Sequence, residues 1–255
     1  MIEREGENRS LLLAQDRHRI SMQLPDPDCS GLFLAGTARF RSVWSPAIGY
    51  ARGMDKSVLA ALRKWPNVPA AYGWLALDRR GAWFLQGEPI LHRRLIAFIN
   101  RNYLADESGA WYFQNGPQKA YVTLAYTPWI WHHPRDEATM AGDGLSALSS
   151  HTGEQATSLK GAWIDEQGNL LLETELGIGL LDDRDLEPCT SALCQPDGTP
   201  LPENNLAEAI ERLMTGQQAS LGFRLGTSIV PVCPIRSTEV PGYFGFVQDP
   251  KPPAS

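Results

Sequence analysis

The chain has 255 residues, of which 43% are hydrophobic and 20% are charged, and its formal net charge is −6. Eight Trp, eight Phe and seven Tyr supply enough large apolar side chains to bury a core, which excludes disorder along the whole chain. No run approaches the roughly 20 apolar residues that span a bilayer, and the acidic balance gives no overall positive field to attract nucleic acid.

The first 53 residues differ from the rest. They show neither helical nor strand periodicity, and Pro25, Pro27 and Pro46 interrupt their few apolar stretches. Seven Arg against six acids give this segment a net charge of +1, so residues 54–255 carry −7. Two interpretations stay open: a disordered N-terminal arm, or an extension upstream of a biological start at Met54.

The number of cysteines and the N-terminal sequence indicate in which cellular compartment the protein is expected. Four cysteines in a chain of this length are too few for the disulfide framework of a small secreted domain. The N-terminal sequence is rich in acids and lacks the apolar core of a secretory signal. We therefore expect a cytoplasmic protein.

A first α+β subdomain is predicted over residues 54–133. Its first helix follows Asp55, which can cap it, and ends at Pro66. A second helix is predicted over 92–103, where apolar side chains recur on one stripe. Strand patterns are predicted at 74–77, 111–114 and 119–126, and a further edge strand at 128–131.

The pattern Asp-x-x-Gly occurs three times, beginning at Asp78, Asp106 and Asp165, and apolar residues follow each copy. An Asp that accepts hydrogen bonds from the turn backbone, followed by a Gly with positive φ, is typical of a hairpin turn. A calcium loop needs several oxygen ligands at alternating positions, and these segments offer one or two. The pattern therefore favours turns over metal loops.

The remainder is predicted as a linker over 134–158, a second α+β subdomain over 159–248 and a frayed tail over 249–255. In the second subdomain a helix opens at Asn205, and strands are expected at 170–175, 221–225, 228–233 and 243–247.

Both halves contain a hairpin, a helix and further strands, which suggests that residues 66–133 and 159–248 are related by internal duplication. Sheets with few helices make α+β the expected class, and we predict mostly antiparallel sheets in two related subdomains.

The most distinctive stretch runs from Gly73 to Ile90 and contains Asp78-Arg79-Arg80-Gly81-Ala82-Trp83-Phe84 and the turn Gly87-Glu88-Pro89-Ile90. It resembles a family of uncharacterised proteobacterial proteins, filed as a domain of unknown function. These share the Asp-x-x-Gly-x-Trp-Phe hairpin, the Gly-x-Pro-Ile turn and a helix after it. The similarity covers roughly 65–132 well and the later half loosely. The resemblance implies a repeated α+β architecture and no established activity.

Candidate catalytic and metal-binding residues are sparse. Cys189 and Cys194 are too far apart for a zinc knuckle, and no nucleophile motif is present. The strongest polar candidates are His132, His133, Asp182 and Asp183, which would serve a small-molecule hydrolase or metal-dependent enzyme. Because neighbouring side chains on a strand point to opposite faces, the two histidines do not form an obvious ligand pair. We predict no catalytic residue, metal or cofactor for the leading hypothesis.

The leading hypothesis is a binding or regulatory module, because Trp residues recur in strand-like segments and exposed Trp marks recognition surfaces. Trp129, Trp131 and Glu88 are the predicted ligand-binding residues, in a groove between the two halves. For most of these Trp residues the favoured alternative is to fill the core, because sheets of this size need large side chains to pack against the helix. The expected partner is a small molecule or a protein, with neither nucleic acid nor membrane.

Overall fold

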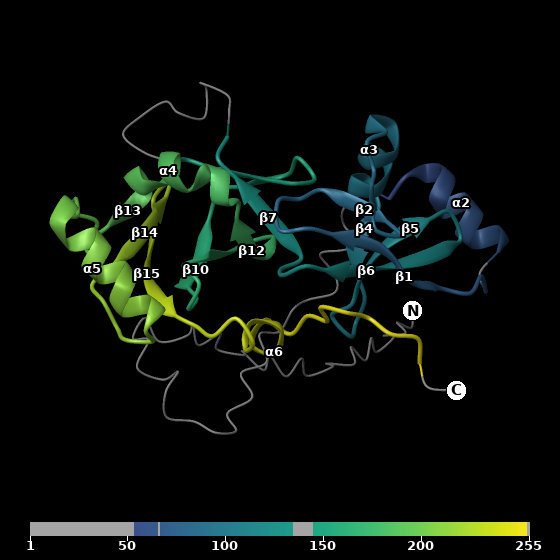
Figure 1. Cartoon of the computed structure of the whole chain (residues 1–255). Helices are drawn as coiled ribbons and strands as arrows, with labels where there is room; N and C mark the ends of the chain where they lie inside the picture. Colours follow the sequence, from purple (N-terminus) through teal and green to yellow (C-terminus); the bar gives the residue numbers. More distant parts are fainter. Residues whose placement is uncertain (1–53, 66, 135–144, 254–255) are drawn as a thin grey trace, which may run out of the picture.

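The computed structural model describes residues 54–65, 67–134 and 145–253, and all structural statements concern these residues. The N-terminal segment 1–53, with its two predicted interpretations, lies outside them. Two mixed sheets lie side by side along an elongated molecule, with α2 at one end and α5 at the other (Figure 1). The α+β class is confirmed.

The first sheet has six strands in the order β3-β2-β1-β6-β5-β4. The parallel pair β1 and β6 forms its centre, and the outer pairs are antiparallel. The bounds are β1 Ala71–Leu77, β2 Trp83–Leu85, β3 Glu88–Pro89, β4 Tyr103–Ala105, β5 Trp111–Asn115 and β6 Gln118–Leu124. The helices of this half are α2 Lys56–Lys64 and α3 Arg93–Arg101.

The second sheet has nine strands in the order β13-β14-β15-β10-β11-β12-β7-β8-β9. The bounds are β7 Trp129–His132, β8 Leu148–Ser150, β9 Gln155–Ala156, β10 Leu159–Ile164, β11 Leu170–Thr174, β12 Gly177–Leu181, β13 Leu193–Cys194, β14 Gly222–Leu225 and β15 Ser228–Pro234. The helical segments are η3 Asp183–Asp185, α4 Leu186–Cys189, η4 Thr190–Ala192, α5 Glu203–Met214 and α6 Val240–Phe244.

The same strand order occurs in both sheets. The first sheet has the order β3-β2-β1-β6-β5-β4, and part of the second has the order β12-β11-β10-β15-β14-β13. In each series the central pair is parallel and the other pairs are antiparallel. In both, a hairpin of the first two strands pairs in parallel with the last strand of the unit. The units differ in their helices, because α3 precedes β4 whereas α5 is inserted between β13 and β14.

The predicted Asp-x-x-Gly turns are confirmed, and each closes an antiparallel hairpin. In the first, Asp78 Oδ1 accepts hydrogen bonds from the backbone N–H groups of Arg80 and Ala82 at 2.9 and 2.7 Å. Gly81 has φ +81°, a backbone conformation that is unfavourable for residues other than glycine. Asp106 and Asp165 accept the equivalent bonds in their own turns.

Three local expectations differ from the structure. The predicted linker 134–158 contributes β8 and β9 to the second sheet, because Leu145 and Leu148 are buried there; residues 135–144 lie outside the described part. The strand expected over 243–247 is replaced by α6, which ends at Gly245 in the left-handed conformation. Asp55 precedes α2 but makes no side-chain cap, since its carboxylate binds Arg101.

A continuous hydrophobic core extends through both sheets. Large aromatic side chains dominate it, in agreement with the core-filling alternative for most of the Trp residues: Trp83, Trp111, Trp129, Trp131 and Trp163 are buried, whereas Trp65 and Trp74 are exposed. Tyr126 joins the halves by donating its hydroxyl proton to buried Asp165 at 2.7 Å. Among the described residues, no helix is both long and apolar enough to cross a membrane.

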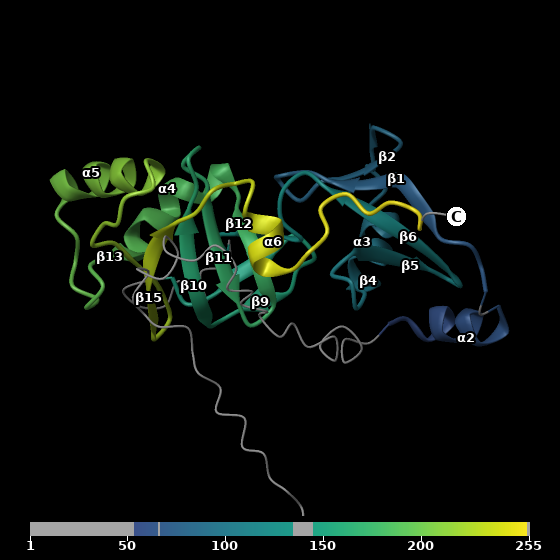
Figure 2. The same cartoon turned by 90° about the horizontal axis from the view of Figure 1, so that it is seen from below.

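The C-terminal strap, residues 245–249, returns from the second sheet to the first (Figures 1 and 2). The N–H of Val247 donates to the carbonyl of Gly109 at 3.0 Å, and the N–H of Leu124 donates to the carbonyl of Gln248 at 2.8 Å. Part of the predicted tail 249–255 is therefore held: Asp249 accepts from the Thr123 hydroxyl at 3.4 Å. Residues 254 and 255 lie outside the described part.

Candidate functional site

A cluster of polar side chains lies where β7 and β12 end side by side. The two strands are parallel neighbours, with Leu181 opposite Trp131, so both chains leave the sheet at the same edge. The first residue after β12, Asp182, donates its N–H to the Trp131 carbonyl at 2.9 Å. Because the carboxyl ends of parallel strands are where ligands commonly bind, this edge is the natural place to look for a site.

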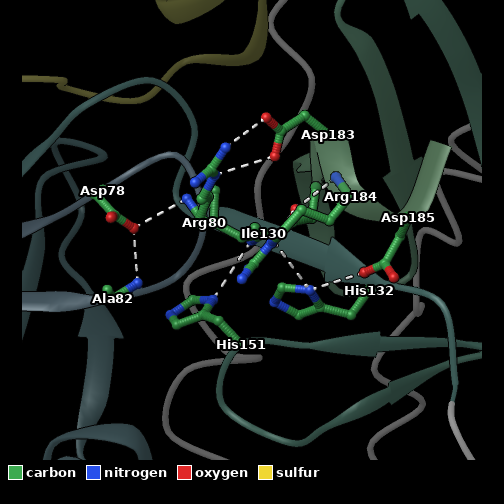
Figure 3. Close-up of polar contacts among 10 residues, drawn as sticks. Asp78, Arg80, Ala82, Ile130, His132, His151, Asp183, Arg184 and Asp185 are labelled. Atoms are coloured by element: carbon green, nitrogen blue, oxygen red, sulfur yellow. Dashed lines mark hydrogen bonds and ion pairs between the residues drawn. The ribbon is translucent and has the colours of Figure 1, made fainter.

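Three potential ligand side chains, those of His132, Asp182 and Asp185, converge at this edge, and Figure 3 shows His132 and Asp185 pointing toward one another. The Nδ1 of His132 lies 3.1 Å from a carboxylate oxygen of Asp185 and 3.4 Å from one of Asp182. The three ligand atoms all lie within 4.8 Å of one another. A nitrogen and two carboxylate oxygens at this spacing can share a proton or hold a metal ion.

Asp182 is the innermost member, with a side chain that is 0% exposed. It caps η3 by accepting from the N–H of Arg184 at 2.9 Å, and the Arg184 guanidinium also bonds both of its oxygens. Burial by itself raises the pKa of Asp182, but the bonds from Arg184 outweigh burial and lower the pKa to about 2. Asp182 is therefore ionised at neutral pH.

Asp183 takes a different direction and bridges the two halves. Its carboxylate receives two bonds from the Arg80 guanidinium, at 2.8 and 3.1 Å (Figure 3). Arg80 lies in the β1–β2 turn of the first sheet, so this ion pair spans 103 residues of sequence. Beside it lies a pocket of about 250 Å³, lined by Arg79, Arg80, Asn169, Leu170, Leu180, Leu181, Asp183 and Leu186.

His151 lies next to this cluster but faces the aromatic core. Its Nδ1 accepts from the N–H of Ile130 at 3.4 Å, and its Nε2 has no hydrogen-bond partner among the described residues. The rings of Trp83, Tyr103 and Trp129 surround it at centroid distances of 5.6, 5.6 and 5.8 Å. Burial, and to a smaller degree the charge of nearby His132, lowers the pKa of His151 to about 3.

The structure brings together half of the predicted polar set. His132 and Asp182 meet, whereas Asp183 pairs with Arg80 and His133 joins no potential metal-binding group among the described residues. Asp185 was missed. Its signal was the spacing from Asp182, because the residue before a helical turn and the residue three positions later are neighbours in capping motifs.

The cysteines considered as ligands are buried, free thiols outside this group. Burial raises the pKa of Cys189 to about 12, and it raises that of Cys194 as well. Neither is a thiolate at neutral pH, so neither is an activated nucleophile.

The residues predicted to bind a ligand lie in two separate places. Trp129 and Trp131 are 4% and 0% exposed, and the Trp131 indole N–H donates to the Leu172 carbonyl at 3.0 Å. Trp129 also lines a cavity of about 30 Å³, room for about one water molecule. Glu88 is exposed on β3, the outermost strand of the first sheet.

A family model described as "Protein of unknown function (DUF2946)" matches residues 54–251. The chain belongs to this family. The DUF2946 match agrees with the predicted resemblance to a domain of unknown function. The description of the family names no activity. A comparison with curated proteins gives no match. Among solved structures, the chain is similar to a DUF1285 family protein from Silicibacter pomeroyi DSS-3, with 16% identity, a TM-score of 0.43 and coverage of 75% of this chain and 97% of that one.

Proposed function

We propose that the protein is a binding module that takes a small anionic molecule in the pocket between its two halves. The carrying observation is the composition of that pocket: two arginines from the first sheet face leucines from the second. Guanidinium groups recognise carboxylate and phosphate oxygens, and Leu186, the one exposed leucine of the lining, would contact an apolar body. A volume of about 250 Å³ suits a ligand smaller than a typical drug.

The ion pair between Arg80 and Asp183 lies beside the pocket, and Arg80 could exchange Asp183 for a bound anion. The side chains of Arg80 and Asp183 are 55% and 59% exposed, and an exposed pair of this kind contributes little to stability because water screens it. An incoming anion would therefore replace Asp183 on Arg80 at little cost. Arg79 is held in place by its guanidinium, which lies 4.7 Å from the centre of the Tyr126 ring.

The test is a thermal-shift screen of the full chain with small mono- and dicarboxylates, inorganic phosphate and phosphate monoesters, followed by calorimetry of each hit. We expect Arg80→Gln to weaken binding by at least about tenfold, and Asp183→Asn to strengthen it because Arg80 loses its internal partner. Arg63→Gln, which removes an exposed arginine of α2, is the matched control. Equal affinities in all four proteins, or no hit at all, would reject the pocket as an anion site.

A metal-dependent enzyme is the second candidate, favoured by the convergence of His132, Asp182 and Asp185. This group contains two of the four residues predicted from sequence, which were His132, His133, Asp182 and Asp183. The test is turnover of a panel of phosphate and carboxylate esters in the presence of Zn²⁺ or Mn²⁺. Hydrolysis that disappears in Asp185→Asn would favour the enzyme, and no hydrolysis would favour the binding module.

We also infer that the two strand units arose by duplication of residues 66–133 and 159–248. The shared strand order and the equivalent Asp turns support this, and superposition of the two units in a crystal structure tests it. The cytoplasmic location, and ligand binding by Trp129, Trp131 and Glu88, stay predictions. Cell fractionation tests the location, and a Glu88→Gln variant tests the exposed member of the ligand set.

A further inference from the structure

We propose that His132, Asp182 and Asp185 form a binding site for a divalent transition-metal ion, with Zn²⁺ as its best-suited occupant. The ligand atoms would be Nδ1 of the histidine and one oxygen of each carboxylate. The inference is independent of the anion pocket and requires no catalytic turnover.

The distances fit one ion. Zinc bonds nitrogen and oxygen at about 2.0–2.2 Å, so two ligands on one ion lie about 3.0 Å apart at a right angle and about 3.4 Å apart at the tetrahedral angle. The two distances from His132 Nδ1 are 3.1 and 3.4 Å. The Asp185 side chain is 17% exposed at the end of a short helical turn, so rotation of its carboxylate can adjust the third side of the triangle.

The local charge also favours a cation. Three carboxylates gather here, those of Asp182, Asp183 and Asp185, and two guanidinium groups face them. Arg80 neutralises Asp183 and Arg184 neutralises Asp182. The carboxylates therefore outnumber the guanidinium groups by one, and Asp185 has His132 rather than an arginine as its side-chain partner in the described structure.

The surroundings already orient the ligands. Arg184 fixes both oxygens of Asp182, and hydrogen-bonded carboxylates of this kind are typical of the shell around protein metal sites. His132 is held by β7, whose end is fixed against β12 by backbone pairing. Two of the three ligands therefore occupy rigid positions before an ion arrives.

The donor set selects the class of ion. Mg²⁺ and Ca²⁺ prefer sites made of oxygen alone, whereas an imidazole nitrogen suits Zn²⁺ and its first-row neighbours. Three protein ligands leave at least one position for water, since four-coordinate zinc is the common case. This donor set therefore predicts zinc binding that excess Mg²⁺ does not displace.

The experiment is calorimetric titration of the full, metal-free chain with Zn²⁺ in the presence of a non-thiol reductant and millimolar Mg²⁺. We expect one equivalent to bind. Asp185→Asn and His132→Gln should weaken binding by at least about tenfold, as loss of a ligand or of its support does. The adjacent residues supply the controls: His133→Gln should bind as the unchanged protein does, and Asp183→Asn, which removes a charge but no ligand, should weaken binding less than either ligand variant. Circular dichroism confirms that each variant is folded.

Titration with Co²⁺ gives a second measurement, because its visible absorption distinguishes nitrogen and oxygen ligands from thiolates. Absence of stoichiometric binding, equal losses in all four variants, or a thiolate charge-transfer band would each overturn the proposal. Asp183→Asn also separates the two sites: it is expected to strengthen anion binding, while the chain still binds one equivalent of zinc.

Discussion

Substitution of Gly81 by alanine tests how closely the first hairpin packs against the second half. Gly81 has φ +81°, where a residue with a Cβ is disfavoured by roughly 1–2 kcal/mol. A Cβ built there would lie 2.5 Å from the Cβ of His151, which is well inside van der Waals contact. Overpacking of this kind costs typically about 1–3 kcal/mol. We therefore expect Gly81→Ala to lower the free energy of unfolding by about 2–5 kcal/mol.

The matched control is Gly87→Ala in the next turn. Gly87 has φ +86°, nearly the same backbone conformation, but a Cβ there would meet nothing within 4 Å. Urea unfolding of both variants, followed by tryptophan fluorescence, isolates the steric part as the difference, about 1–3 kcal/mol. Equal destabilisation of the two variants would refute the close approach of Gly81 to His151, and with it the fixed placement of the two halves.

Other measurements follow from the same contacts. Tyr126→Phe removes the hydroxyl that donates to buried Asp165 and should cost about 1–3 kcal/mol in urea unfolding; no loss would mean that water replaces the bond. Because the pKa of His151 is lowered from 6.5 to about 3, between these two pH values its imidazole is protonated in the unfolded chain but not in the folded one. Stability should therefore fall as pH drops below about 6.5, by about 1.4 kcal/mol per unit, and His151→Asn should flatten this slope. Gly109→Ala places a Cβ against the carbonyl oxygen of Gly245, so it should release the C-terminal strap to protease; an unchanged cleavage rate would contradict that contact.

Local patterns predicted most of the individual elements. The Asp78 and Asp165 turns were predictable because the hydrogen bonds that close them lie within five residues of sequence. Pairing between distant strands was not, since β7 could equally have completed the first sheet by pattern alone. It pairs instead with β12, and this non-local choice places His132 beside Asp182.

The candidate site was predictable to the same limited extent. A list of polar residues near strand ends contained His132 and Asp182, but it could not separate Asp183 from Asp185. The separation comes from the turn η3, in which Asp183 points to Arg80 in the other half while Asp185 returns toward Asp182. The role of Asp183 therefore depends on an arginine 103 positions away, which no local pattern contains.

The C-terminal strap has a consequence for biosynthesis. Its bonds to the first half join residues that are far apart in sequence, from Ala125 and Gln248, 123 positions apart, to Gly109 and Val247, 138 positions apart. Chains emerge from the ribosome N-terminal half first, and contacts at such separations form slowly because a long loop must close. The six-stranded sheet is thus synthesised early but receives these partners only after residues 245–249 have emerged. During that interval the turn that precedes β5 and the end of β6 are exposed to chaperones, and a nascent chain stalled before residue 245 would present them for as long as it persists.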